Sequence, residues 1–359
     1  MKIGILTFHW GTNYGAVIQA FALCRYLNGL GHGTEIINYS PKVIKFNRFK
    51  NNLRSLNFRD IIKEFKLKIF RKKWLNLSKA IYNNKSDLKQ INNYYDLYIC
   101  GSDQIWNEWF TLNAEKEPTL SYYFDFVDIQ IPRASYAASF GTEKLPENMI
   151  KIILPELKKF SHISVREYTG KKIIEDMGFK AEIVADPTLL INRRIYQKIY
   201  ANTKIKKRYH LFSYILHRNQ RNVHEIKEYL FEKHYKPTGK VKYENEPLSM
   251  EEWLYNFENS DFVLTNSYHG VIFSIIYHKS FIATYTEGAK MNDRLDTLLK
   301  ALGLKYRIAG SFEKDKIDYI YNLNIDWQEI DIKLAKLRES SIEFLERAIK
   351  LNQIADIQT

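Results

Sequence analysis

The stretch "FVLTNSYHGVIFSIIYHKSFIATY", residues 262–285, contains apolar runs on both sides of a short polar patch. "FVL" before the patch has the length of a buried strand, "VIFSIIY" after it continues at helical length, and "SFIATY" is again apolar like a strand. This order predicts a strand–helix–strand unit, the building block of parallel sheets. The polar patch at 265–269 therefore falls at the carboxyl end of a strand, where open parallel sheets bind ligands.

The same alternation recurs along the chain. At the N-terminus a strand is expected in "KIGILTF" (2–8), a helix in "VIQAFALCRYLNGLG" (17–31) and a second strand in "TEIINYS" (34–40). Further strands that end in polar turns are expected within 95–106, 133–141, 162–178, 181–190 and 209–216. Strands that alternate with helices throughout predict an α/β fold with parallel sheets.

The length of 359 residues favours two domains. We expect an N-terminal Rossmann-like domain at 1–160, with a basic insertion at about 42–75 and completed by a C-terminal helix at 328–352. A second Rossmann-like domain is expected at 161–320.

Positive charge is concentrated in one segment. Residues 42–73 contain twelve Lys and Arg against Asp60 and Glu64, a local balance of 12 − 2 = +10 out of a formal net charge of +13 for the chain. Apolar residues interleave with these charges, a pattern typical of elements that bind an anionic membrane surface or another polyanion. The alternative is a solvated helix pair packed on its domain. No nucleic-acid-binding motif accompanies the charge, so no nucleic-acid partner is expected.

Cysteine and histidine usage argues against disulfides and metals. The two cysteines, Cys24 and Cys100, each lie in an apolar segment, and the nine histidines do not pair at helical spacing. We therefore expect no metal. The first apolar segment is too short for a secretory signal, and no stretch approaches the ~20 apolar residues of a spanning helix. These features predict a cytoplasmic protein.

Two residues at strand ends are the first candidates for chemistry. His269 precedes Gly270 at the expected start of a helix, where free N–H groups favour an anion, so it is a candidate phosphate contact or general acid. The alternative is that it only caps the helix. Arg166 ends an apolar strand in "SVREYTG", where it could bind phosphate or carboxylate, or form an internal salt bridge with Glu167 or Asp186.

Weaker signals lie in three other loops. "CGSDQIWN" places Ser102 and Asp103 after a strand, where they could bind an acceptor hydroxyl or an anion. Asn13 lies in a tight loop before a helix. Lys290 and Arg294, after the strand "SFIATY", are candidates for further anion contacts or for ordinary surface charge.

Taken together, these segments resemble the polysaccharide pyruvyl transferase family. The resemblance covers about residues 1–310, and six motifs in order carry it. They are "GILTFHWGTNYGAVIQAFAL" (4–23), "YICGSDQIWN" (98–107), "YAASFG" (136–141), "SVREYTG" (164–170), "VADPTLL" (184–190) and "DFVLTNSYHGVIFSIIYHKSFI" (261–282).

The resemblance implies a glycosyltransferase-B-like fold of two Rossmann-like domains that face a cleft, with the donor site on the second domain. It also implies that phosphoenolpyruvate is the co-substrate, with no other cofactor. The pyruvyl group would move to two hydroxyls of one sugar in a surface polysaccharide or its lipid-linked precursor, giving a cyclic ketal and phosphate.

Site roles follow from the same resemblance. Catalytic roles are expected for His269, as acid or phosphate clamp, for Arg166, as phosphate or carboxylate contact, and for Asp103, as base or acceptor contact. The donor site is expected to comprise Arg166, Ser267, His269, Gly270, Lys290 and Arg294, and the acceptor site Asn13, Tyr14, Ser102 and Asp103. With a lipid-linked acceptor, residues 42–73 would hold the protein on the inner face of the membrane.

One departure from the family pattern affects donor binding. Many members have arginine immediately before a leucine–histidine–glycine, whereas this chain has Ser267 and Tyr268 before its histidine. Lys290 or Arg294 is expected to supply the missing positive charge. Two alternatives stay open: a nucleotide-sugar-dependent glycosyltransferase of similar fold, and a non-catalytic relative that binds a polyanion or a membrane.

Overall fold

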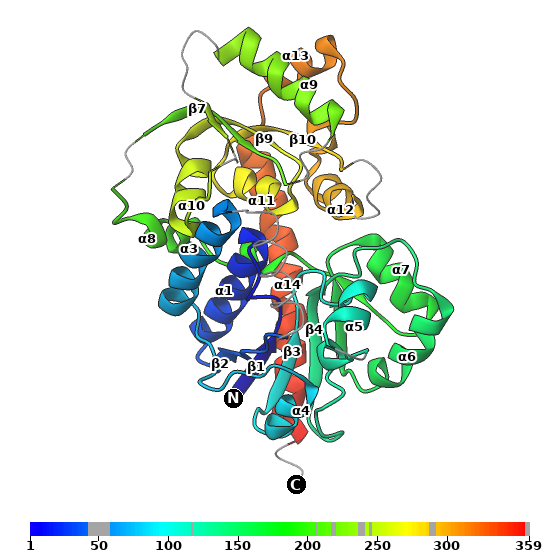
Figure 1. Ribbon diagram of the computed structural model, residues 1–359. Coiled ribbons are helices and arrows are strands. Elements are labelled where there is room, and N and C mark those ends of the chain that lie inside the picture. The colour runs from blue at the N-terminus through cyan, green and yellow to red at the C-terminus, as the bar shows by residue number, and fades with distance from the viewer. Residues whose placement is uncertain are drawn as a thin grey trace. The chain divides into compact units, whose positions relative to one another are not determined.

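The computed structural model describes residues 1–41, 58–115, 118–204, 207–216, 220–235, 241–243, 246–286 and 292–355. The chain divides into two compact units. Unit 1 comprises Met1–Ile191 and Lys336–Thr359, and unit 2 comprises Asn192–Ala335. Figure 1 shows both units, with elements labelled where there is room.

Unit 1 is built on a six-stranded sheet in the order β2-β1-β3-β4-β5-β6, and every neighbouring pair is parallel. The strands are β1 (Lys2–Leu6), β2 (Gly33–Ile36), β3 (Leu97–Cys100), β4 (Arg133–Ala138), β5 (His162–Val165) and β6 (Glu182–Ile183). β3 and β4 are buried along their whole length, as expected of central strands covered on both faces.

The helices of unit 1 connect these parallel strands. They are α1 (Tyr14–Gly29), α3 (Phe58–Trp74), α4 (Lys85–Leu88), α5 (Glu108–Asn113), α6 (Glu147–Leu157) and α7 (Tyr168–Asp176), with the short 3-10 turns η1 (Lys89–Ile91), η2 (Ser121–Tyr123) and η3 (Pro187–Leu189). α1 starts where the Asn13 side chain accepts a hydrogen bond from the Gly15 N–H at 2.9 Å. Most of α1 is buried, which accounts for its nearly continuous apolar sequence.

Unit 2 contains a five-stranded parallel sheet in the order β11-β10-β9-β7-β8. The strands are β7 (Tyr209–Tyr214), β8 (Val241–Tyr243), β9 (Ser260–Thr265), β10 (Ser280–Thr284) and β11 (Ile308–Ala309). Its helices are α8 (Arg193–Tyr200), α9 (Arg221–Leu230), the π-helix η4 (Phe231–Tyr235), α10 (Met250–Glu258), α11 (Tyr268–Ile276), α12 (Asp293–Leu302), the 3-10 turn η5 (Lys305–Arg307) and α13 (Lys314–Asn322). The strand–helix–strand unit expected at 262–285 is β9, α11 and β10.

The boundary between the units differs from the expectation. It falls after Ile191, not at 160, because β5 pairs with β4 and β6 pairs with β5 in the first sheet. The last helix, α14 (Trp327–Ala355), begins in unit 2 and belongs to unit 1 from Lys336 onward. There it contacts the segment after β6, where the Ala185 N–H donates to the Ser341 hydroxyl at 2.8 Å. Arg166 therefore belongs to unit 1.

Among the helices of the described residues, none is long and apolar enough to cross a membrane.

Candidate functional site

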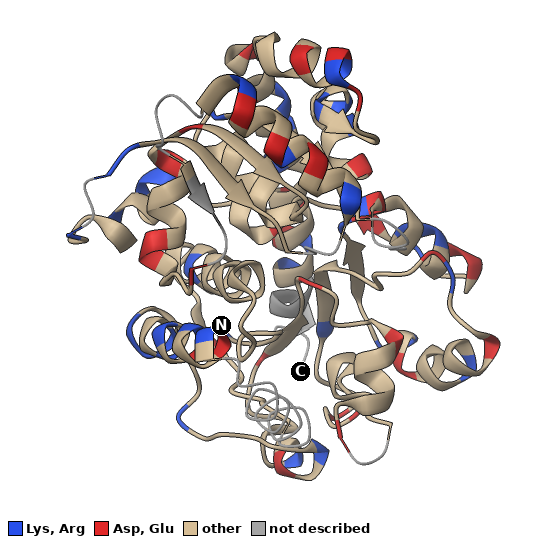
Figure 2. Cartoon of the chain, turned by 45° about the horizontal axis from the view of Figure 1, so that its top comes forward, with Lys and Arg blue, Asp and Glu red and all other residues tan. Residues whose placement is uncertain are grey.

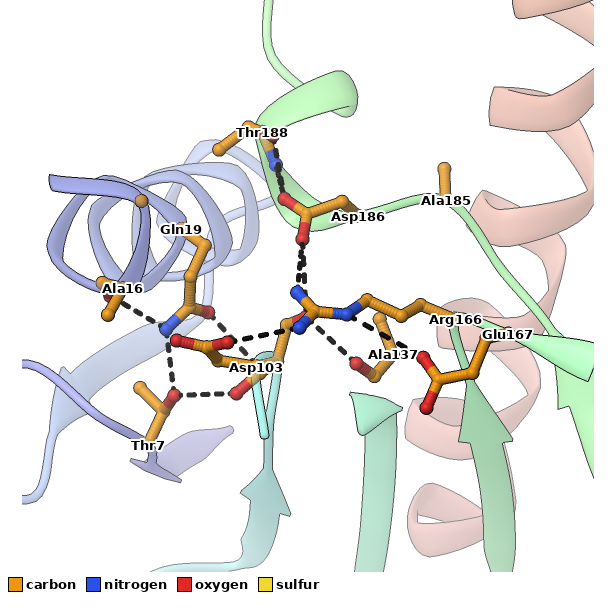
Figure 3. A network of polar contacts seen from close by, with 12 residues as sticks. Thr7, Ala16, Gln19, Asp103, Ala137, Arg166, Glu167, Ala185, Asp186 and Thr188 are labelled. Carbon is orange, nitrogen blue, oxygen red and sulfur yellow. Dashed lines mark hydrogen bonds and ion pairs between the residues drawn. The ribbon is translucent and has the colours of Figure 1, made fainter. Parts of the chain in front are cut away.

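A network of charged side chains lies at the carboxyl edge of the unit 1 sheet (Figure 3). Arg166 directly follows β5, and its Nη2 lies 3.0 Å from Asp103 Oδ1 while its Nη1 lies 3.2 Å from Asp186 Oδ2. Its Nε lies 3.7 Å from Glu167 Oε2. Asp103 follows β3 and Asp186 follows β6, so the parallel sheet itself brings these groups to one edge.

The members of this network differ in how deeply their side chains are buried. The Arg166 side chain has no exposed surface, whereas that of Asp103 is 11% exposed. Among the described residues, the guanidinium lies within 4.0 Å of three carboxylates. A buried guanidinium in such a setting is compensated from within the protein. The internal salt bridge that the sequence left open is present, and Asp103 is the member of the cluster that reaches the surface.

Ser102 belongs to the support of this cluster. Its hydroxyl donates to the Ala137 carbonyl at 2.8 Å and lies 3.4 Å from Asp186 Oδ2, and the residue is fully buried. The other Asp186 oxygen accepts from the N–H and the hydroxyl of Thr188, at 3.0 and 2.6 Å. The Ser102 hydroxyl is thus directed into the protein, not toward the surface where an acceptor would bind.

Gln19 is a member of the network that the sequence reading did not single out. From α1, its Nε2 donates to Thr7 Oγ1 and the Ala16 carbonyl, both at 2.8 Å, while its Oε1 accepts from the Ser102 N–H at 3.0 Å. The signal was a single amide inside the apolar run "AVIQAFAL", because a buried amide requires partners. Gln19 fixes the loop after β3 to α1 (Figure 3).

The backbone of that loop is also held in place. Gly101 has φ +115°, and a Cβ added to it would lie 2.2 Å from the Tyr136 carbonyl oxygen, so glycine is required there. Asp103 itself has φ 75°, and its carbonyl accepts from the Ser139 N–H at 3.0 Å. The Asp103 carboxylate is therefore positioned both by its backbone and by Arg166.

A different arrangement surrounds His269 in unit 2. Ser267 caps α11 by accepting from the Gly270 N–H at 3.2 Å, and Thr265 Oγ1 accepts from the Ser267 N–H at 3.0 Å. The Thr265 hydroxyl donates to the Tyr214 carbonyl at 2.6 Å, which joins this turn to β7. The polar patch thus builds the start of the helix and places His269, nearly buried, in its first turn.

Gly270 is explained by packing. A Cβ at this position would lie 2.3 Å from Thr265 Oγ1. The glycine therefore lets α11 approach β9 closely.

Arg294 supplies positive charge near this helix start. It lies in the first turn of α12, and its Cζ is 5.7 Å from the centre of the Tyr268 ring. By the family pattern given above, the arginine position falls at Ser267, directly before Tyr268. Lys290, the other candidate replacement, lies outside the described residues.

The remaining candidates lie at the start of α1. Asn13 is exposed and serves as the helix cap, whereas Tyr14 is buried with Lys63 Nζ 4.1 Å from its ring centre. In the described part of the chain, no group of three or more His, Cys, Asp or Glu side chains is arranged to hold a metal ion.

The structure therefore separates the sequence candidates into two sets. Ser102, Asp103 and Arg166 lie together in unit 1. Ser267, His269, Gly270 and Arg294 belong to unit 2. Arg166, which we expected on the same domain as His269, instead shares unit 1 with Asp103.

Solved structures with similar folds include UDP-GlcNAc 2-epimerases. UDP-GlcNAc 2-epimerase from Neisseria meningitidis, bound to UDP-GlcNAc, aligns with a TM-score of 0.56 and 10% identity over 97% of this chain and 100% of that chain. S. aureus MnaA, in a co-structure with UDP, aligns with a TM-score of 0.54 and 9% identity, over 98% of this chain and 97% of that chain. UDP-GlcNAc 2-epimerase from Methanocaldococcus jannaschii aligns with a TM-score of 0.51 and 14% identity, over 91% of this chain and 93% of that chain. At these identities the likeness establishes the glycosyltransferase-B-like α/β fold alone.

The family assignment rests on sequence. No curated protein matches the chain. The family model described as polysaccharide pyruvyl transferase matches residues 13–288, well over half of the chain. The match includes the loops that carry Asp103, Arg166 and His269, and the chain belongs to the polysaccharide pyruvyl transferase family of enzymes.

Proposed function

We propose that the protein transfers the pyruvyl group of phosphoenolpyruvate to two hydroxyls of one sugar in a surface polysaccharide or its precursor. The products are a cyclic ketal and phosphate, and no cofactor takes part. Family membership supports pyruvyl transfer to a polysaccharide in general. The donor, the ketal and the acceptor are the parts that the proposal adds.

The donor is assigned to the start of α11. Phosphoenolpyruvate carries a phosphate and a carboxylate, and a helix N-terminus with an adjacent guanidinium suits a ligand with two anionic groups. The observation that carries this assignment is the position of Arg294, 5.7 Å from the Tyr268 ring beside the first turn that holds His269. Arg294 thus takes over the role of the arginine that the family pattern has at the position of Ser267, and His269 contacts the phosphate or acts as general acid.

The acceptor is assigned to Asp103. Its side chain is the least buried of the unit 1 network, at 11% exposed, and its carboxylate can accept a hydrogen bond from a sugar hydroxyl. Arg166 is buried and engaged by three carboxylates, so its role in the proposal changes from donor contact to positioning of Asp103. Asn13, at the exposed start of α1, is a second candidate for acceptor contact.

The reaction balances with one acid and one base. One sugar hydroxyl attacks C2 of the enol and loses its proton to the base, while the acid protonates C3, turning the methylene into a methyl group. The second hydroxyl then attacks C2, the C2–O bond to phosphate breaks, and the released proton leaves with phosphate. Asp103 is proposed as the base and His269 as the acid.

Calorimetric titration with phosphoenolpyruvate tests the donor assignment without knowledge of the acceptor. The wild type is expected to bind phosphoenolpyruvate in preference to inorganic phosphate and uridine diphosphate. Arg294→Ala is expected to weaken this binding at least tenfold, because a hydrogen bond to a charged group contributes about 1.5–3 kcal/mol. Arg208→Ala is the matched control, since Arg208 is an exposed arginine of the same unit that pairs with Asp261.

Each result has a defined reading. Equal losses in Arg294→Ala and Arg208→Ala would refute a specific contact at Arg294. Preference for uridine diphosphate would replace the proposal with the nucleotide-sugar alternative.

A further inference from the structure

Helix α3 is attached to unit 1 by one of its faces. Phe70 and Trp74 contact Phe21 of α1, with ring centres 6.4 and 6.2 Å apart. Arg71, largely buried, donates from Nη1 to the Gly11 carbonyl at 3.1 Å and pairs with Glu64. This face gives α3 an apolar contact of the kind that normally anchors an amphipathic helix.

A second apolar stripe lies on the opposite side, in solvent. Its members are Phe58, Ile61, Ile62, Phe65 and Ile69, with exposed fractions of 66, 37, 46, 64 and 52%. Phe58, Ile62, Phe65 and Ile69 follow one another at intervals of four, three and four residues, and Ile61 lies at the edge of the same face of the helix. A contiguous exposed stripe of large apolar side chains marks a surface that binds something.

Basic residues border this stripe. Arg59, Lys68, Lys72 and Lys73 are all exposed on α3. The helix turns by about 100° per residue. At that rotation its two acidic residues, Asp60 and Glu64, lie on the same side as the residues that pack against α1. Figure 2 shows the predominance of Lys and Arg along α3. The outward face thus combines apolar side chains with charge of a single sign.

We propose that α3 binds the surface of an anionic lipid bilayer, with its exposed stripe inserted among the acyl chains and its basic border on the headgroup phosphates. An amphipathic helix with large apolar residues on one side and Lys and Arg beside them is the element that lies in a membrane interface.

Charge complementarity selects lipid over other occupants. A second copy packed symmetrically through this face would bring the basic borders of two α3 helices together, and like charges repel. A nucleic acid would engage the basic residues but would leave the isoleucines and phenylalanines without an apolar partner. An anionic bilayer satisfies both kinds of side chain.

The position of α3 connects this surface to the proposed reaction. Arg71 donates to the carbonyl of Gly11, in the loop that contains the candidate acceptor residue Asn13, and Lys63 lies over Tyr14 at the start of α1. Resting on the proposed function, this contact would bring that loop to the bilayer that carries a lipid-linked sugar. The binding of α3 to lipid does not depend on it.

Co-sedimentation of the full chain with vesicles tests the proposal. The vesicles are phosphatidylcholine with and without phosphatidylglycerol. The wild type is expected to bind only those that contain phosphatidylglycerol. Phe65→Ser/Ile69→Ser is expected to lower the partition at least tenfold, and Lys68→Gln/Lys72→Gln by about fivefold for each charge removed.

The controls make the same changes elsewhere in unit 1. Ile129→Ser alters an isoleucine that is 78% exposed outside α3, and Lys151→Gln removes an exposed charge from α6. Both are expected to partition like the wild type, and all variants should melt at the wild-type temperature because the altered side chains are exposed.

Three results would overturn the proposal. Absence of binding to either vesicle, or binding that the α3 variants leave unchanged, would do so directly. Self-association by sedimentation velocity that Phe65→Ser/Ile69→Ser abolishes, without vesicle binding, would assign the stripe to a second copy. Titration of the same variants with phosphoenolpyruvate reports separately on the proposed function.

Discussion

The Arg166 network of unit 1 and the first turn of α11 in unit 2 are both polar patches after parallel strands, but they treat charge in opposite ways. In the network, a fully buried guanidinium is surrounded by three carboxylates and tied to α1 through Gln19 and Ser102. At α11, neutral hydroxyls build the helix start, and the arginine lies on the next helix. Charge that is compensated within the protein holds shape, whereas a helix N-terminus beside a cation can receive an anionic ligand.

Removal of Arg166 gives the largest expected effect. Arg166→Ala leaves Asp186 and Glu167 buried without their cation, so the free energy of unfolding should fall by about 3–5 kcal/mol. This differs from an anion-binding residue at the surface, whose removal would leave the fold intact. Urea unfolding measures the change.

The double variant Arg166→Ala/Asp186→Asn tests whether the lost stability comes from the uncompensated charge. It removes one uncompensated charge and is expected to recover part of the lost stability, since the two residues share an ion pair. A loss below about 1 kcal/mol in Arg166→Ala would show that Arg166 is not held by these carboxylates and would reopen its role in donor binding.

Variants of Asp103 and His269 are expected to differ in kcat and in their affinity for phosphoenolpyruvate, which distinguishes the two regions. With a sugar that supports phosphate release by the wild type, Asp103→Asn is expected to lower kcat at least about 100-fold, because the amide keeps the shape but not the basicity. Its affinity for phosphoenolpyruvate should be unchanged. His269→Ala, in contrast, is expected both to lower kcat and to weaken the binding of phosphoenolpyruvate. Loss of donor affinity in Asp103→Asn would place the donor at the unit 1 network instead.

Two glycines sharpen the comparison at the level of packing. Gly270→Ala should destabilise by about 1–3 kcal/mol, because the new Cβ meets Thr265 Oγ1. Thr265→Ala removes that atom, so the double variant should be more stable than the sum of the two single effects predicts. At Gly101 the obstacle is the Tyr136 carbonyl oxygen, and no side-chain change can relieve it. Additive losses at Gly270 and Thr265, measured by thermal unfolding, would contradict this account.

Much of the fold could be predicted from local pattern, and the units' boundary could not. Alternating apolar strands and helices predict an α/β protein because side-chain periodicity is a local property. β5 and β6 have only four and two residues, and nothing in their composition indicates which sheet they join. Their parallel pairing with β4 and with each other places the boundary after Ile191.

For the site as well, contacts between residues near in sequence could be predicted, whereas contacts between distant residues could not. Glu167 and Asp186 were recognisable as partners of Arg166, but Asp103 lies 63 positions away and meets it only through the order of strands in the sheet. Arg294 could be proposed from sequence as a source of charge, whereas its place beside Tyr268 depends on how α12 packs.

The smallest expected effect concerns acid stability at β5, the strand that ends just before Arg166. Burial lowers the pKa of His162, and the nearby Arg347 lowers it further, while Glu182 partly opposes them. The folded state therefore resists protonation of His162, and below about pH 6.5 the unfolded chain binds a proton that the folded chain does not. Stability is lost as the pH falls through this range, and above it His162 contributes no pH dependence.

His162→Gln should remove this loss, so its free energy of unfolding should decline less than that of the wild type between about pH 7.5 and pH 5. The difference should stay below about 1 kcal/mol, because the side chain is only partly buried. His234→Gln is a second test in unit 2, where burial and Lys233 also lower the pKa of the histidine while Asp318 opposes them, so a reduced decline is expected there as well. If both variants follow the wild type across this range, neither histidine accounts for the acid sensitivity of the fold.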